Sequence, residues 1–214
     1  MPQDAFNLRY LCAELDGLFR GGRVNRIVMP TESEAVFTVY TGKRTEKLYI
    51  SANPSAPRIG VTETEKDSPL TACAFCMLLR KHLLASEIVS VSIVGFDRIV
   101  KIEFVTRGEF SDGEEKTLFI ELMGRYSNVI LTEKGKVLGC NRGINDFDNG
   151  VRPLVSGRAY VFPPDNGKLC YYDEKIASVF NAYTEADGEL SDFAFKTLQG
   201  FAATTAREAV YRYE

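Results

Sequence analysis

Residues 88–106 read IVSVSIVGFDRIVKIEFVT, and residues 116–132 read KTLFIELMGRYSNVILT. Apolar and polar side chains alternate along much of these two stretches, for example from Val91 to Ile93 and from Val100 to Phe104. A repeat of two places successive side chains on opposite faces of a strand, so one face is buried and the other is polar. The pattern predicts four consecutive strands, over residues 88–94, 98–106, 116–123 and 128–132, with a loop over 109–115.

The residues before this block predict two helices and a hairpin. Apolar side chains recur at helical spacing over residues 4–19, where Asp4 is placed to cap the helix and Gly21-Gly22 to end it. The same kind of reasoning predicts strands over 35–40 and 47–51 and a second helix over 70–85 that Ser68-Pro69 opens.

The residues after the strands change in character. Residues 140–168 are rich in Gly, Asn, Asp and Pro and are typical of a long loop, and three short helices are predicted over 173–183, 189–200 and 204–213. We therefore expect an α+β protein with a helix-flanked, mostly antiparallel β domain over residues 1–170 and a small helical module over 171–214. A doubly wound parallel sheet is not expected.

Composition excludes several classes of protein. The chain has 214 residues, of which 45% are hydrophobic and 26% are charged, so it is not of the disordered class. No apolar run reaches the roughly 20 residues that span a bilayer, and the first residues do not resemble a secretory signal. The net charge of −3 argues against a protein that coats nucleic acid without specificity. The acidity is concentrated in residues 161–214, which leaves room for a basic face on the rest of the chain.

The five cysteines predict reduced thiols and a cytoplasmic location, because their number is odd and no signal peptide is evident. Cys73 and Cys76 form a CxxC pair inside an apolar helical pattern, and the only histidine is His82. A structural zinc site needs four ligands, so we expect no metal and no cofactor, and we interpret these cysteines as small buried hydrophobic side chains.

Standard catalytic motifs are absent from the sequence. There is no GxGxxG after a strand, no P-loop and no HExxH, and His82 would have to serve any nucleophile–base system. Pro2 opens one alternative, because removal of Met1 would leave a secondary amine that can attack an aldehydic sugar carbon, as in formamidopyrimidine-type DNA glycosylases and their AP lyase activity. Those enzymes carry an acid directly after the proline, where this chain has Gln3, so no catalytic residue and no DNA partner are expected.

Two polar clusters lie at the ends of predicted strands. Asp97-Arg98 follows the glycine turn at Gly95, and Glu121 is followed by the run from Met123 to Asn128. The structural interpretation of Asp97-Arg98 is a turn with a surface ion pair, and that of the Glu121 cluster is a two-strand hairpin whose turn Ser127-Asn128 closes. Each cluster also has a functional interpretation, since an Arg side chain offers a planar fork suited to phosphate or a base edge. The residues alone leave both interpretations open.

Three segments carry a family resemblance: FCMLLRKHL (75–83), FDRIV (96–100) and ELMGRYSNVIL (121–131). Together with Arg152-Pro153, Gly157, Tyr160, Pro163-Pro164 and Ala206-Arg207-Glu208, they resemble the NFACT-N domain of the RqcH/FbpA family, whose eukaryotic relatives include NEMF. The match extends over essentially the whole chain in order. It implies a fold similar to the N-terminal domain of formamidopyrimidine-DNA glycosylase, followed by helix-two-turns-helix elements. It also implies that the chain is part of a longer protein.

The resemblance implies a ribosome quality-control factor rather than an enzyme. Such a factor binds large ribosomal subunits obstructed by peptidyl-tRNA and recruits alanyl-tRNA for template-free C-terminal alanine tailing. The family's older name, fibronectin-binding protein, leaves a surface adhesin as the alternative. No membrane partner is implied.

The resemblance also implies which residues handle tRNA. In the family, an Asp near the start of the first helix and an Asp-Arg pair have this role, and they correspond to Asp4, Asp97 and Arg98. We predict that these three converge on one solvent-facing polar patch. A second set of residues is expected nearby or in support, namely Glu121, Arg125 and Asn128.

Overall fold

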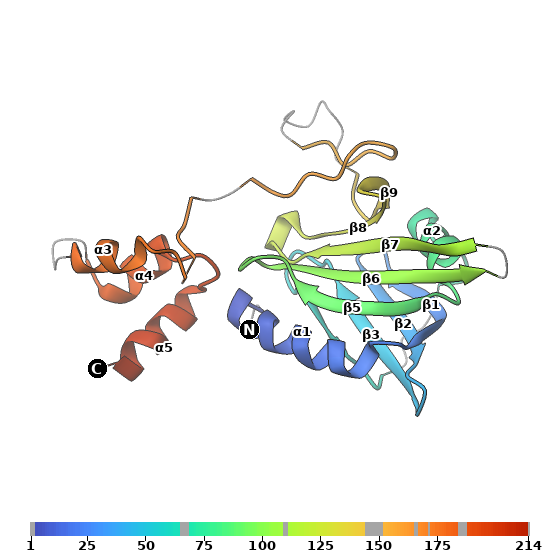
Figure 1. Cartoon of the computed structure of the whole chain (residues 1–214), viewed down its shortest axis with the longest axis horizontal. Helices are drawn as coiled ribbons and strands as arrows, with labels where there is room; N and C mark the ends of the chain where they lie inside the picture. The colour runs from blue at the N-terminus through green and yellow to red at the C-terminus, as the bar shows by residue number, and fades with distance from the viewer. Residues whose placement is uncertain are drawn as a thin grey trace.

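The computed structural model describes residues 3–64, 69–108, 111–143, 152–164, 167–170, 172–183 and 188–213. These residues form a nine-stranded sheet flanked by two helices, and a module of three short helices beside it (Figure 1). Every pair of neighbouring strands is antiparallel, which confirms the prediction of an α+β fold with an antiparallel sheet. Pro2 lies outside the described residues.

The sheet has the strand order β4-β3-β2-β1-β5-β6-β7-β8-β9. Its strands are β1 (Arg23–Thr31), β2 (Glu34–Tyr40), β3 (Thr45–Ser51), β4 (Arg58–Val61), β5 (Glu87–Ile93), β6 (Ile99–Gly108), β7 (Ser111–Glu121), β8 (Asn128–Glu133) and β9 (Lys136–Cys140), with a short 3₁₀ turn η1 (Gly124–Tyr126) before β8.

The sheet bends between β1 and β5, where the two strands share the single register pair Arg23–Glu87. The two halves face each other across the core, and the ring of Phe37 on β2 stacks on that of Phe104 on β6 at 6.4 Å between centroids. Helix α1 (Ala5–Phe19) packs against β5, and helix α2 (Ala74–Leu83) packs against β1. The Arg80 Nε donates to the Ile27 carbonyl at 2.8 Å, so α2 satisfies part of the edge of β1 that β5 leaves open.

The helices and strands differ from prediction in specific places. Helix α1 begins after Asp4 as predicted, but α2 begins at Ala74 with Cys73 as its N-cap and not after Pro69. The predicted loop over 109–115 is wrong from Ser111 onward, because β7 starts there and pairs Glu115 with Val105 of β6. Strands β1, β4 and β9 were not predicted.

The outer face of strands β6–β9 carries a second, smaller core. Its buried members are Ile99, Phe119, Ile130, Val137 and Leu154, and Tyr160 packs against them. The Tyr160 ring stacks on Phe119 at 4.2 Å between centroids. The segment from Arg152 to Phe162 therefore crosses this face of the sheet as an ordered strap.

The helical module contains α3 (Ile176–Asn181), α4 (Leu190–Thr197) and α5 (Ala203–Tyr213). It has its own small core around Ala194, Leu198 and Ala206. Its resemblance to helix-two-turns-helix elements, and that of the sheet to the glycosylase domain, stay predictions. None of the described helices is long and apolar enough to cross a bilayer.

The module meets the β domain at the start of α1. The backbone N–H of Ala5 donates to the Gly200 carbonyl at 3.3 Å. The Phe6 ring lies edge-on to Phe96 and to Phe201, with 4.6 Å between centroids in each case. Segments from the beginning, the middle and the end of the chain thus meet at one junction.

Candidate functional site

A cavity of about 320 Å³ opens at this junction between the two modules. Its lining comes from the start of α1, the turn between β5 and β6, the segment before the helical module, and the α4–α5 connection. The lining residues are Gln3, Asp4, Asp97, Arg98, Lys168, Phe195, Gly200, Phe201, Ala202 and Ala203. The cavity therefore brings together Asp4, Asp97 and Arg98.

Asp4 lies between two helices. One carboxylate oxygen accepts the backbone N–H of Asn7 at 2.9 Å, which caps α1, and the other accepts the Thr205 hydroxyl from the first turn of α5. Both helix N-termini favour a negative charge at this position, because their free N–H groups carry the positive ends of the helix dipoles. Asp4 is 8% exposed, so it is a buried wall of the cavity, and its predicted position on a solvent-facing patch is wrong.

Asp97 and Arg98 occupy the tight turn of the β5–β6 hairpin. The Val94 N–H donates to the Ile99 carbonyl at 2.8 Å, and Gly95 adopts a φ of 59°, which a side chain would disfavour. The Asp97 carboxylate accepts the Arg98 backbone N–H at 2.7 Å. Within the described residues the Arg98 guanidinium has no ion pair, so its donors are available to a ligand in the cavity.

Lys168 adds a second cation that the sequence did not indicate. Its ammonium donates to the Phe195 carbonyl at 2.6 Å and lies 4.5 Å from the centroid of the Phe195 ring. Burial lowers the pKa of Lys168, and the nearby Arg98 charge lowers it further. The cavity therefore combines two cations, two carboxylates and two phenyl rings. No sequence signal marks Lys168, because only the tertiary fold brings it opposite Arg98.

Glu121 lies outside the cavity. Its side chain is 2% exposed and forms an ion pair with Arg152, which also donates to it at 3.0 Å. The Tyr160 hydroxyl donates to the same carboxylate at 2.8 Å, and burial, followed by the Glu121 charge, raises the pKa of Tyr160 well above its usual range. Glu121 thus anchors the strap. The next residue, Leu122, contacts the site through its backbone, because its N–H donates to the Arg98 carbonyl at 2.9 Å.

Asn128 and Arg125 also lie outside the cavity. The Asn128 amide donates to the Arg142 carbonyl at 2.8 Å and accepts the Arg142 N–H at 3.0 Å, so it fixes the chain just after β9. Arg125 is exposed and its guanidinium lies 4.7 Å from the centroid of the Tyr126 ring. Of the six predicted site residues, three meet in the cavity and three have other surroundings.

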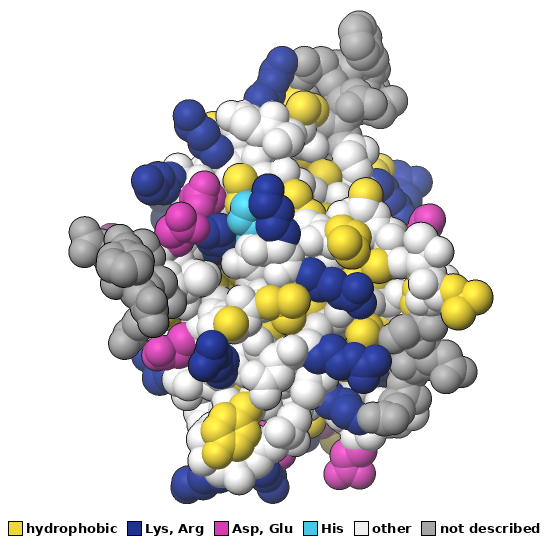
Figure 2. Space-filling view, turned by 90° about the vertical axis from the view of Figure 1, so that its right-hand side faces the viewer, with side chains coloured by type: hydrophobic (Ala, Val, Ile, Leu, Met, Phe, Trp, Pro, Cys, Tyr) yellow, Lys and Arg dark blue, Asp and Glu magenta, His cyan; other side chains and the backbone are white. Residues whose placement is uncertain are grey.

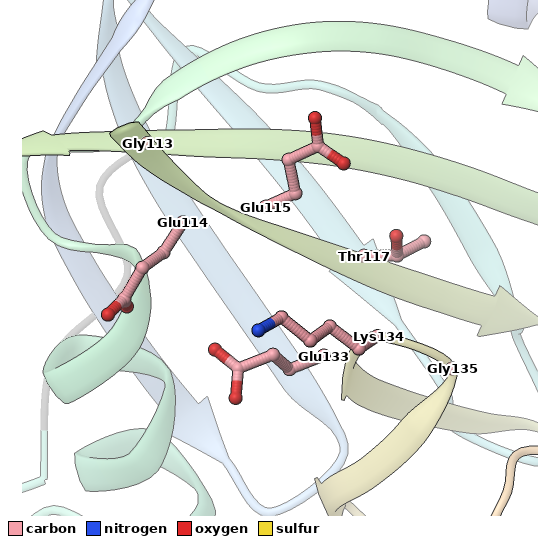
Figure 3. A pocket seen from close by; sticks show the side chains of 7 residues that line it. All are labelled: Gly113, Glu114, Glu115, Thr117, Glu133, Lys134 and Gly135. Carbon is pink, nitrogen blue, oxygen red and sulfur yellow. The ribbon is translucent and has the colours of Figure 1, made fainter. Parts of the chain in front are cut away.

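A second pocket of about 500 Å³ lies at the far end of β7 and β8 (Figure 3). Glu114, Glu115, Glu133 and Lys134 surround it. The buried Lys116 ammonium beside this pocket forms ion pairs with Glu114 at 2.7 Å and with Glu133 at 3.1 Å. These two carboxylates therefore compensate the buried charge of Lys116. Within the part of the chain that the structure describes, no group of three or more His, Cys, Asp and Glu side chains could hold a metal ion.

The cysteines lie in different surroundings in the described structure. All five cysteines are free, and Cys12 and Cys76 are buried in the core. Burial, together with the Asp16 charge, raises the pKa of Cys12 to about 12. Cys73 caps α2, and its sulfur accepts the Cys76 N–H at 3.4 Å.

Residues 4–214 match the family described as NFACT N-terminal and middle domains. The chain belongs to this family. Among its curated relatives is the Rqc2 homolog RqcH of Streptococcus pneumoniae, 32% identical over an alignment of 214 positions that covers 97% of this chain and 38% of the relative. RqcH of Bacillus subtilis is 29% identical over 93% of this chain and 35% of the relative. The chain thus spans little more than a third of these relatives.

Other NFACT relatives extend to eukaryotes and to solved structures. The human ribosome quality control complex subunit NEMF is 32% identical over 127 residues, 59% of this chain and 11% of NEMF. The N-terminal domain of the fibronectin-binding protein PavA from Streptococcus pneumoniae has a TM-score of 0.87 at 31% identity and covers 98% of this chain and 79% of that structure. The N-terminal part of the fibronectin/fibrinogen-binding protein from Streptococcus suis has the same TM-score at 29% identity, over 96% of this chain and 77% of that structure.

Proposed function

We propose that this NFACT chain is the tRNA-binding part of a cytoplasmic ribosome quality-control factor. The whole factor binds large ribosomal subunits obstructed by peptidyl-tRNA and recruits alanyl-tRNA for template-free C-terminal alanine tailing. The chain itself positions tRNA and has no catalytic role, because the ribosome forms the peptide bond. The names of the RqcH and NEMF relatives support the ribosomal setting.

The observation that carries this proposal is the convergence of Asp4, Asp97 and Arg98 on one cavity. Arg98 offers a planar fork to a phosphate or a base edge, and a charge-assisted hydrogen bond of this kind contributes about 1.5–3 kcal/mol. The carboxylate of Asp97 accepts hydrogen bonds from exposed base amino groups or ribose hydroxyls, which is how proteins read unpaired RNA. Carboxylates repel phosphate, so the acids supply selectivity rather than affinity.

The test is tRNA binding by a double variant, Asp97→Ala with Arg98→Ala. We expect its affinity for alanyl-tRNA to fall by at least tenfold, the equivalent of about 1.4 kcal/mol, while its melting temperature changes little. A matched control, Glu208→Ala with Arg212→Ala, removes an exposed acid–base pair on α5 that lies outside the cavity. Wild-type tRNA binding by the cavity variant would contradict the site assignment.

Fibronectin binding is a second candidate, favoured by the similarity to the solved N-terminal domains of two proteins that are named for this activity. This candidate predicts measurable affinity of the chain for immobilised fibronectin that survives moderate salt, together with exposure of the protein on intact cells. Binding that disappears at moderate salt would indicate an unspecific charge effect.

A further inference from the structure

Cations gather on the face of the molecule where α2 lies against β1. Three of them, Arg23, Arg26 and Lys81, are exposed, and Arg80 is partly exposed between the helix and the strand. We call these four residues the α2–β1 basic face. Figure 2 shows this side of the molecule, with Lys and Arg side chains spread across its middle, beside and below the cyan His82, and with acidic side chains directly to the left of His82 and toward the edges.

The backbone explains how the four cations come to share one surface. The bond from the Arg80 Nε to the Ile27 carbonyl, at 2.8 Å, fixes the last turn of α2 beside β1. An irregularity in the β1–β2 register between Val24 and Arg26 leaves Arg26 on the outside of the sheet, opposite Thr38. The strand cations and the helix cations thus lie on two elements that pack side by side.

The dipole of α2 explains only two of the four cations on the basic face. Arg80 and Lys81 lie in the last turn of α2, where cations stabilise the helix dipole. Arg23 and Arg26 lie on a strand, where no dipole favours them. Among the residues that the structure describes, none of Arg23, Arg26 and Lys81 forms an ion pair, although the chain as a whole has a net charge of −3. Unpaired cations concentrated on one face of an acidic protein indicate a polyanionic partner.

We propose that the α2–β1 basic face binds the phosphate backbone of RNA without reading its sequence. Arginine forks match phosphate oxygens, and phosphate contacts give affinity and orientation rather than specificity. A lipid surface fits less well, because the apolar face of α2, made by Phe75, Cys76, Leu79 and Leu83, is buried in the core and leaves Met77 as the one exposed large apolar side chain of the helix.

The basic face is separate from the cavity. Figure 1 places α2 at one end of the β domain, and the β5–β6 turn and the start of α1 at the other. The inference rests on the proposed function in one respect, the choice of RNA as the polyanion. It adds a second contact that holds a different stretch of RNA from the one in the cavity.

The test compares two double variants that each remove two charges. Arg26→Gln with Lys81→Gln changes the basic face and spares Arg80, which supports β1. Lys175→Gln with Arg207→Gln removes two exposed cations from the helical module as the matched control. Binding to a short RNA duplex of arbitrary sequence is measured against salt concentration. For the basic-face variant we expect about tenfold weaker binding, and a slope of log affinity against log salt smaller by about 2.

Each outcome decides the proposal. Equal effects of the two variants on duplex affinity would overturn it, and so would unchanged RNA binding with a loss of binding to vesicles of phosphatidylserine and phosphatidylcholine. The cavity variant Asp97→Ala with Arg98→Ala separates this proposal from the proposed function. Loss of alanyl-tRNA by the cavity variant supports the proposed function, and its retention contradicts that function, whatever the basic-face variant does to duplex RNA. Loss of duplex RNA by the basic-face variant supports the basic face, and its retention overturns it, whatever the cavity variant does to alanyl-tRNA.

Discussion

Asp4 serves two helices with one carboxylate, so its contribution to stability and its contribution to binding have to be separated by substitution. Asp4→Ala removes the α1 cap and the acceptor for Thr205, and we expect a loss of about 1–2 kcal/mol in the free energy of unfolding. Asp4→Asn keeps an equally good cap and removes the charge, and it replaces the oxygen that accepts the Thr205 hydroxyl with an NH2 group from which this hydroxyl can accept instead. Urea unfolding measures the first effect. Asp4→Asn should be close to wild type in stability and weaker in tRNA selectivity; a loss of stability equal to that of Asp4→Ala would show that the charge itself holds α5.

His82 gives the protein a pH dependence that can be followed at a single residue. Burial, followed by the charges of Lys116 and Lys81, lowers the pKa of His82 below its usual 6.5. The folded state therefore binds this proton more weakly than the unfolded state, so the stability that neutral His82 contributes is present above pH 6.5 and is lost as the pH falls through the folded value. An NMR titration of the one histidine should give a midpoint below 6.5. Between pH 7 and 5.5 wild type should lose more stability than His82→Gln; equal losses would contradict this.

At the scale of elements, Gly200 sets how closely the helical module approaches the β domain. It has a φ of 83°, and a Cβ at this position would lie 2.5 Å from the Phe96 ring and 2.8 Å from the Ala5 side chain. Gly200→Ala should therefore cost about 2–4 kcal/mol, from backbone strain and overpacking together. Gly42→Ala is the matched control, since its φ of 85° is similar and nothing lies within 4 Å of the added Cβ. Thermal unfolding measures the loss of stability in both variants, and the difference between them is the effect of overpacking at Gly200. Equal losses would mean that the junction is not tightly packed.

The strap over β6–β9 depends on the buried Glu121–Arg152 pair. Arg152→Met leaves the carboxylate of Glu121 buried without its cation, which we expect to cost about 3–5 kcal/mol. Glu121→Gln combined with Arg152→Met should recover much of this loss, because no unpaired charge remains. Limited proteolysis between Arg152 and Phe162 follows release of the strap. If the double variant is as unstable as Arg152→Met alone, shape and not charge holds the strap in place.

The strands differ in how far they could be predicted from the sequence. Strands such as β6 alternate regularly and were predicted, whereas the irregular register near Val24 hides the alternation of β1, and β4 has only four residues. In β9, Gly139 lacks a side chain because the Leu78 side chain occupies that space, 2.8 Å from where a Cβ would lie. For the site, Asp4, Asp97 and Arg98 were found by family resemblance. Glu121 was expected beside the site, and its role in holding the strap could not be predicted because its partner Arg152 is 31 positions away in the sequence.

At the scale of the whole molecule, the cavity and the α2–β1 basic face occupy opposite ends of the β domain (Figure 1). The cavity is lined by both modules, so a ligand that contacts all of its walls binds only when the modules are docked. The basic face belongs to the β domain alone. Two RNA contacts that differ in this way should stabilise different parts of the chain.

Amide hydrogen exchange distinguishes RNA binding in the cavity from RNA binding on the α2–β1 basic face. A ligand at one hundred times its Kd stabilises the bound state by about 2.7 kcal/mol, which slows exchange through local opening by roughly 100-fold. Alanyl-tRNA should slow exchange at the β5–β6 turn and in the first turn of α5, because Asp97 and Ala203 line the cavity. A short RNA duplex should instead slow exchange in the last turn of α2, around Lys81. Protection of α2 by both RNAs with none at α5 would place all RNA binding on the basic face and leave the cavity without a role.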